Sequence, residues 1–181
     1  MTDGISTKGQ ERFMNDAHRS RLKTGLLWGL FLSLPCYVFD QWTKWLVNSN
    51  LEVGQGFTVL PGFFDIIHTR NTGAAFSLLQ GIPESYRLIF FAGVTGVAFV
   101  AVVFIFLKVK DASLLIKLTM SLIVAGAIGN LTDRILFNEV VDFLSFHVGR
   151  FRWPTFNLAD VYITIAMIGL IIHSFGLPTR K

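Results

Sequence analysis

Long apolar stretches separated by polar segments dominate the hydropathy pattern of this chain. Four of them approach the roughly 20 residues that an α-helix needs to cross the hydrocarbon core of a bilayer. They cover residues 24–47, 88–107, 114–137 and 158–177, and the second contains no charged residue. The pattern predicts a mainly α-helical, polytopic membrane protein with four transmembrane helices, in which residues 24–177 form a single membrane domain.

Composition supports this class of protein. Hydrophobic residues make up 52% of the 181 residues and charged residues 15%, with a mean hydropathy of +0.54. Soluble domains of this size are rarely so apolar. The 18 phenylalanines and 4 tryptophans suit a lipid-facing surface and interfacial belts. The single cysteine, Cys36, makes an internal disulfide impossible, and spacings typical of zinc ligands are absent. We expect no metal, no cofactor and no nucleic-acid partner.

Basic residues cluster beside three of the polar segments. They are Lys8, Arg12, Arg19, Arg21 and Lys23 before the first span, Lys108, Lys110 and Lys117 around the short link between the second and third, and Arg180 and Lys181 at the end. The positive-inside rule then places both termini in the cytoplasm and the loops 48–87 and 138–157 outside it. Residues 1–23 are expected to form a loose cytoplasmic or interfacial tail, and residues 178–181 a cytoplasmic C-terminus.

A cleaved signal peptide is the alternative interpretation of the first span, because a basic region precedes it. However, "FDQWTK" follows where a small-residue cleavage site would be needed, so we expect the span to remain in the protein. In the first outer loop, "GFTVLPGFFDIIHTRN" mixes β-branched and aromatic residues with Gly and Pro. This composition predicts two or three short strands, and hence a small β-containing segment at the outer membrane surface.

Ionisable side chains within apolar spans are costly, so each needs a partner or a function. With the predicted orientation, nearly all of them lie at a similar depth near the outer ends of the helices. They are Asp40, Lys44, Asp133, Arg134, Asp142 and Asp160. His173 alone lies near an inner end, where an interfacial position is expected. The outer side of the membrane is therefore the predicted place of any chemistry.

The third span carries small and polar residues at helical spacing, which predicts one stripe facing other helices. Its members are Gly126, Gly129, Asn130, Asp133, Arg134 and Phe137. We favour a structural interpretation, in which the glycines permit close packing and Asp133 and Arg134 pair with Asp40 and Lys44. In the first outer loop, Asn71 and Gly73 predict a turn, while the alternative is that the Asn71 amide faces a substrate at the membrane surface.

Asp142 and Asp160 form the pair with the strongest chemical implication. An antiparallel hairpin of the third and fourth spans would bring them together. Asp160 also fits a capping box with Asn157 as N-cap, whereas Asp142, between Val141 and Phe143, has no such local explanation. Two carboxyl groups held close in a low-dielectric site share a proton, so that one acts as a base and the other as an acid.

Five short motifs, taken in order, resemble the signatures of the lipoprotein signal peptidase (signal peptidase II) family. They are "DQWTK" from Asp40, "NTGAAF" from Asn71, "GAIGNLTDR" ending at Arg134, "VVDF" around Asp142 and "FNLAD" ending at Asp160. The resemblance implies an aspartic endopeptidase of the bacterial inner membrane with its active site on the periplasmic side. It implies Asp142 and Asp160 as catalytic residues, and Asp40, Lys44, Asn71, Asn130, Asp133, Arg134 and Asn157 as residues that shape the site.

The same resemblance implies the partners. The substrates would be prolipoproteins cut before a cysteine that carries diacylglycerol, in contact with membrane lipids, and globomycin would inhibit the reaction. The alternatives from other classes are a small proton-coupled transporter, which would need polar residues through the full thickness of the membrane, and a scaffold that binds lipoproteins without cutting them. The aromatic and basic segment 143–154 between the two aspartates is a candidate cover for the site.

Overall fold

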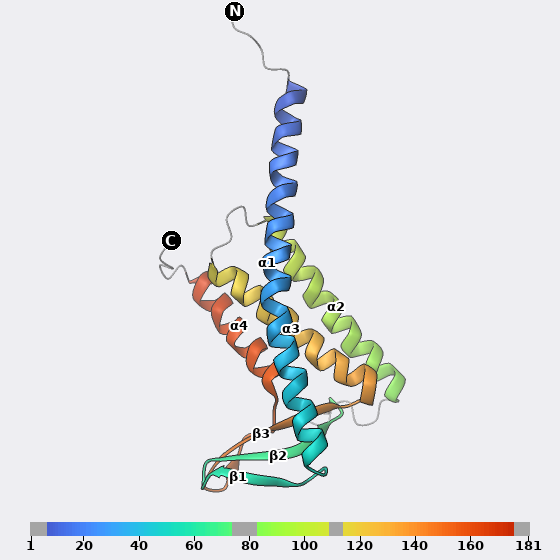
Figure 1. Ribbon diagram of the computed structural model, residues 1–181, viewed down its shortest axis with the longest axis vertical. Coiled ribbons are helices and arrows are strands. Elements are labelled where there is room, and N and C mark those ends of the chain that lie inside the picture. The colour runs from blue at the N-terminus through green and yellow to red at the C-terminus, as the bar shows by residue number, and fades with distance from the viewer. Residues whose placement is uncertain (1–6, 74–82, 109–113, 176–181) are drawn as a thin grey trace, which may run out of the picture.

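The computed structural model describes residues 7–73, 83–108 and 114–175, and consists of four helices and a four-stranded antiparallel sheet. The predicted mainly helical fold with a small sheet is confirmed. In Figure 1 the sheet lies across one end of the helices, and the first helix extends well beyond the other three at the opposite end. Residues 74–76 of the "NTGAAF" motif, the expected end of the last span at 176–177 and the terminus 178–181 lie outside the described residues.

The helices are α1 (Thr7–Asn50), α2 (Glu84–Lys108), α3 (Leu114–Phe137) and α4 (Leu158–Ser174). The bounds of α3 are those predicted, and α2 and α4 differ from prediction by a few residues at their ends. The first helix corrects an expectation: residues 7–23 continue α1 as regular helix and are not a loose tail. Polarity alone was a poor guide here, because Lys, Arg, Glu and Gln are good helix formers.

One helix among the described residues, Leu114–Phe137, is both long and apolar enough to cross a membrane, while Leu88–Val102 and Leu158–Ser174 are shorter apolar helical stretches. That helix, α3, is also the centre of the bundle, since it packs against each of the other three. Small residues permit this. A Cβ atom on Gly126 would lie 2.5 Å from the carbonyl oxygen of Ala159 in α4, so only glycine allows α3 and α4 to approach this closely.

The sheet has the order β1 (Gly56–Leu60), β2 (Phe64–Asn71), β3 (Val140–Val148) and β4 (Phe151–Arg152). The two strands of the first outer loop were predicted. The second outer loop, residues 138–157, was expected only as a loop, but it supplies β3 and β4. The signal was present in the alternating apolar and polar residues of "LSFHV", Leu144 to Val148 of β3, since alternation is typical of a strand.

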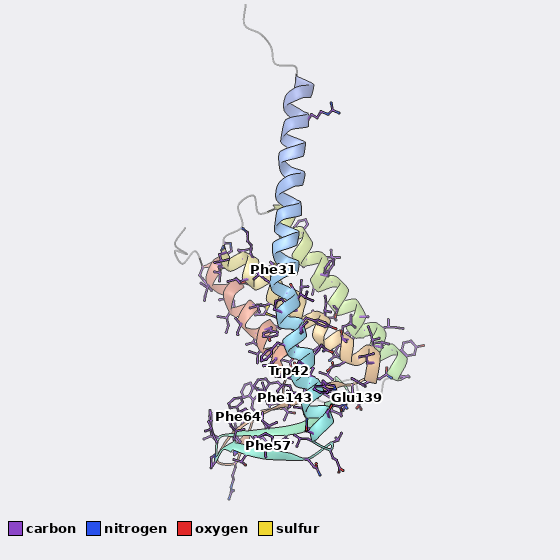
Figure 2. All side chains as sticks on the ribbon, viewed as in Figure 1. Phe31, Trp42, Phe57, Phe64, Glu139 and Phe143 are labelled. Carbon is purple, nitrogen blue, oxygen red and sulfur yellow. The ribbon has the colours of Figure 1, made fainter. Side chains whose placement is uncertain are left out.

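A small apolar core joins the sheet to the bundle. Val47 of α1 and Val141 and Phe143 of β3 are buried together, with Leu51 and Leu158 packed against them. Figure 2 shows Phe143 at this junction, beyond Trp42 on α1, while Phe57 and Phe64 lie farther out on the sheet. Because β3 follows α3 directly and contacts α1, its first residues are held at the end of the bundle where the predicted site residues lie.

Candidate active site

Asp142 lies on β3, where two neighbouring segments fix its side chain. The β2–β3 register pairs Thr69 with Asp142 and Asn71 with Val140, and Asn71 Nδ2 donates to Asp142 Oδ2 at 2.9 Å. On the other side, Phe156 pairs with Leu144, which brings the next residue, Asn157, to donate from Nδ2 to Asp142 Oδ1 at 2.7 Å. The Asp142 side chain is 1% exposed, so both carboxyl oxygens are held in a nearly water-free position.

Asp160 lies at the start of α4, and the predicted capping box is confirmed. The Asp160 N–H donates to Asn157 Oδ1 at 3.1 Å, and the Asn157 N–H donates to Asp160 Oδ2 at 3.2 Å. Its other oxygen accepts from Asn130 Nδ2 of α3 at 2.8 Å. A carboxylate here also interacts favourably with the partial positive charge of the helix N-terminus. The capping and catalytic interpretations are therefore compatible, because the cap orients a side chain that remains partly exposed.

Asn157 connects the two aspartates. Its side-chain amide donates to Asp142 and to Asn130 Oδ1, its side-chain oxygen accepts from Asp160, and its backbone N–H donates to Asp160. It is fully buried, so every contact it makes is with the protein. A single amide side chain, held by the capping geometry of α4, thus sets the relative positions of a carboxyl group on β3 and one on α4.

The environment of Asp142 favours the protonated carboxylic acid. Burial raises the pKa of Asp142 to about 6, and the negative charge of Asp160 acts in the same direction, against the lowering effect of the hydrogen bonds from Asn71 and Asn157. A carboxyl group with a raised pKa beside a second carboxyl group is a common arrangement for general acid catalysis.

Behind the pair, a buried ionic cluster joins α1 to α3 and α4. Lys44 Nζ lies 2.9 Å from Asp40 Oδ2 and 3.1 Å from Asp133 Oδ2, and donates to Asn130 Oδ1 at 3.1 Å. Asp40 Oδ1 accepts from the Ala159 N–H of α4, and Asp133 Oδ2 from the Val141 N–H at the start of β3. The predicted clamp between the first and third spans is confirmed for Asp40, Lys44 and Asp133.

Arg134 does not take the predicted place in this clamp. Its Nη1 donates to the Asn130 carbonyl at 3.2 Å, and its guanidinium lies 3.8 Å from the centre of the Phe91 ring of α2. Its Nε is buried without a hydrogen-bond partner among the described residues. The charge of Arg134 interacts with Asp160, Asp142 and Asp133, so it adds a positive potential to the site.

The turn predicted at Asn71 and Gly73 is present. The Gly73 N–H donates to Asn71 Oδ1 at 2.8 Å, and Gly73 has a φ of +83°, which favours glycine. The turn holds Asn71 so that its amide nitrogen points at Asp142 rather than at solvent. The turn and the hydrogen bond to Asp142 agree with the site-shaping role that the resemblance implied for Asn71.

Gln41 is a site residue that sequence reasoning missed. Its Nε2 lies within hydrogen-bonding distance of Asp40 Oδ2, the Gly129 carbonyl and Asp133 Oδ1, at 3.0 to 3.2 Å. The signal was available, since Gln41 is a polar residue next to Asp40 near the end of an apolar span.

A second polar cluster lies within the sheet, and among the described residues it shares no hydrogen bond with the aspartate pair. Asp65 accepts from Thr58 at 2.9 Å and from Arg152 at 3.2 Å, and His147 Nε2 lies 3.0 Å from it. The hydrogen bond from Thr58 is the main reason that the pKa of Asp65 lies below its usual value. These residues come from all four strands, so the cluster has the geometry of a brace for the sheet.

Gly129 gives a prediction about the ionic cluster. A Cβ atom there would lie 2.5 Å from Asp40 Oδ2, the oxygen that faces Lys44. We expect Gly129→Ala to destabilise the folded protein in detergent by about 1–3 kcal/mol, as other overpacking substitutions do. Gly96→Ala on α2 is the control, because a Cβ there meets nothing within 4 Å. Equal midpoints of thermal unfolding for the two variants would show that Asp40 is not fixed in this position.

The chain is similar to known proteins over most of its length. Residues 32–176, which include every site residue above, match the family model described as Signal peptidase (SPase) II. The chain is 42% identical over 144 residues to a lipoprotein signal peptidase of Syntrophus aciditrophicus, which covers 80% of this chain and 89% of that protein. It is 38% identical over 143 residues to one of Staphylococcus aureus, with coverage of 79% and 85%.

Solved structures share the fold. Two structures described as those of a bacterial membrane enzyme have TM-scores of 0.73 and 0.72 and are 34% and 32% identical to this chain. The first alignment covers 83% of this chain and 94% of the chain in the solved structure, and the second covers 84% and 93%. These similarities define the class as a bacterial membrane enzyme. More particularly, the chain belongs to the signal peptidase II family, and it is a protease of lipoprotein processing.

Proposed function

We propose that the protein is an aspartic endopeptidase that removes signal peptides from diacylglyceryl-modified prolipoproteins by cutting before the lipidated cysteine. Asp142 and Asp160 are its catalytic residues. The observation that carries the proposal is the arrangement of these two carboxyl groups, which come from β3 and α4 and are held by the same side chain, Asn157. Family membership supports the lipoprotein substrate, and the acid–base arrangement supports the aspartic mechanism.

In the proposed reaction, ionised Asp160 takes a proton from a water molecule as the water oxygen attacks the scissile carbonyl carbon. Protonated Asp142 donates a hydrogen bond to the carbonyl oxygen, which becomes negatively charged in the tetrahedral intermediate. When the intermediate collapses, the carbon–nitrogen bond breaks and the proton passes to the leaving amine. The raised pKa of Asp142 supports its assignment as the acid, and the exposed part of Asp160 supports its access to water.

The proposed topology has four spans within residues 24–177, both termini in the cytoplasm and the aspartate pair at the periplasmic end. The sheet then lies at the outer membrane surface, and the peptide bond meets the pair where the diacylglyceryl chains remain in the outer leaflet. Globomycin is proposed to bind at this polar end, in place of substrate. The residues of the β3–β4 hairpin, 143–154, are proposed to cover the site.

A proton-coupled transporter would need titratable groups along the whole bundle. Among the described residues, the buried polar side chains of the helices away from the sheet are the hydroxyl groups of Ser33, Thr119 and Ser121. The hydroxyls of Ser33 and Ser121 donate to backbone carbonyls, and a hydroxyl is not titratable near neutral pH, so these three residues do not provide a proton relay. The distribution of polar residues therefore favours a site at one end over a conduit.

The test of this proposal is the reaction with a defined substrate. Purified protein in detergent is incubated with a prolipoprotein carrying diacylglycerol on its cysteine, and with the same prolipoprotein lacking the lipid. We expect mass spectrometry to show a signal peptide and a product that begins at the lipidated cysteine, and no cleavage of the unlipidated form. Cleavage at another bond, or equal cleavage of both forms, would contradict the proposed specificity.

A further inference from the structure

An apolar groove lies between α1 and α4, away from the aspartate pair. It encloses about 350 Å³, within the range of ligand-binding pockets. α3 forms its floor, and its walls include Leu32 and Cys36 of α1 and Ile168 and Ile172 of α4. Nearly all of its lining is apolar, so it is suited to a hydrocarbon chain and not to a peptide backbone that needs hydrogen-bond partners.

The helix packing explains why the groove is there. α1 and α4 meet near the sheet, where the Ala159 N–H donates to Asp40, and they diverge toward the other end of the bundle (Figure 1). There each contacts α3: Ser33 donates to the Ser121 carbonyl at 3.1 Å, and a Cβ on Gly169 would lie 2.5 Å from Thr119 Oγ1. Since contacts with α3 hold both helices in place, the groove between them is a consequence of how the bundle packs.

The groove is separate from the active site. Ile168 and Ile172 follow Asp160 by 8 and 12 residues, which corresponds to about 12 to 18 Å along the helix axis. In the proposed topology the groove therefore begins near the middle of the bilayer and extends toward the inner leaflet. A molecule in the groove would therefore not compete with a peptide bond held between Asp142 and Asp160.

Two basic side chains lie at the inner end of the groove. Lys117 precedes the lining residue Ser121 by one helical turn, and Ser121 Oγ donates to the Lys117 carbonyl. His173 follows the lining residue Gly169 by one turn on α4 and is exposed. Both basic residues therefore lie within one helical turn of the lining, at the inner ends of the two helices and near the head-group region.

We propose that this groove binds one acyl chain of an anionic phospholipid of the inner leaflet, whose phosphate is held by Lys117 and His173. The apolar lining selects the chain, and the basic end selects the negative charge of the head group. The apolar segment of a signal peptide is the competing occupant, but a basic region precedes that segment at the same membrane face and would meet Lys117 with like charge. The inference rests on the proposed topology and not on the aspartic mechanism.

The single cysteine of the chain provides the measurement. Cys36 lines the groove, so an acyl chain there should slow its alkylation by a membrane-permeant maleimide. The purified protein in neutral detergent is titrated with phosphatidylglycerol or with phosphatidylcholine of the same acyl chains, and labelling is followed by intact mass. We expect protection by phosphatidylglycerol at lower lipid concentration than by phosphatidylcholine.

Variants test the groove and the charge separately. Lys117→Ala should raise the phosphatidylglycerol concentration for half-protection about fivefold, whereas Arg150→Ala at the exposed sheet end should not. Ile168→Trp should fill the groove and protect Cys36 without lipid, whereas Val97→Trp on the exposed face of α2 should not. Equal protection by the two lipids, an unchanged midpoint in Lys117→Ala, or protection by a synthetic signal peptide but not by phosphatidylglycerol would overturn the proposal.

Discussion

Replacing Asp142 or Asp160 by asparagine is expected to slow signal-peptide release by about 100- to 10,000-fold, the usual contribution of a general acid or base. An amide at position 160 cannot take a proton from water, and an amide at position 142 is a far weaker acid than the carboxylic acid that stabilises the carbonyl oxygen in the tetrahedral intermediate. Asparagine nearly matches aspartate in shape, and the neighbours of both side chains are themselves amides that can present oxygen or nitrogen. The measurement is single-turnover cleavage of a lipidated prolipoprotein by purified protein.

Glu139→Gln is the matched control, because this substitution also replaces a carboxylate by an amide. Glu139 lies three residues before Asp142 in the sequence (Figure 2). This variant should cleave at nearly the wild-type rate. Thermal unfolding of all three variants shows whether a lost rate reflects lost structure. If Asp142→Asn or Asp160→Asn unfolds like wild type and still cleaves at a similar rate, the assignment of the pair is wrong.

The second large effect is on stability. Lys44→Met should destabilise the folded protein by about 3–5 kcal/mol, the range found when one partner of a buried ion pair is removed. Lys44 is 3% exposed and is the cation between Asp40 and Asp133, which are 0% and 1% exposed. Without it, two carboxyl groups remain buried close together with no opposite charge between them. Thermal or denaturant unfolding in detergent measures the change.

Arg150→Met is the comparison, since Arg150 is an exposed cation in the β3–β4 turn and its loss should change stability little. If Lys44→Met does not fold, the double variant Lys44→Met with Asp133→Asn should recover part of the loss by removing one unpaired charge. Lys44→Met with the stability of Arg150→Met would show that the cluster does not clamp α1 to α3.

The hydropathy pattern predicted the apolar helices well, but it did not predict the first turns of α1 or strand β3. The bounds of α3 followed from its apolar length, because a helix in lipid must satisfy every backbone group internally and its ends are set by polar residues. The first turns of α1 were not predicted, because no apolar face marks them. β3 was missed because its pairing with β2 joins residues about 70 to 80 positions apart, and the only local sign of such a long-range pairing is the alternation of apolar and polar residues.

Part of the candidate site could be predicted from the sequence and part of it could not. Asp40, Lys44, Asp133 and Asp160 could be singled out because charge in an apolar span is costly, and the capping box at Asn157 is a local pattern. The contacts of Asn157 with Asp142 and Asn130 could not be predicted, because they depend on β3 running beside the residues before α4. The contact of Arg134 with Phe91 could not be predicted for a similar reason, because the sequence of neither helix gives the position of α2 relative to α3.

The central claim is that Asp142 and Asp160 share a proton at working pH, with Asp142 the acid. The most direct test is the dependence of kcat/KM on pH for the lipidated prolipoprotein. Burial raises the pKa of Asp142 to about 6, so its carboxyl is protonated below that pH and ionised above it. We expect kcat/KM to fall as the pH rises through about 6, approaching tenfold per pH unit, with an acidic limb where the second proton binds the pair. A value of kcat/KM that is constant, or that rises, between pH 5 and 8 would contradict the claim.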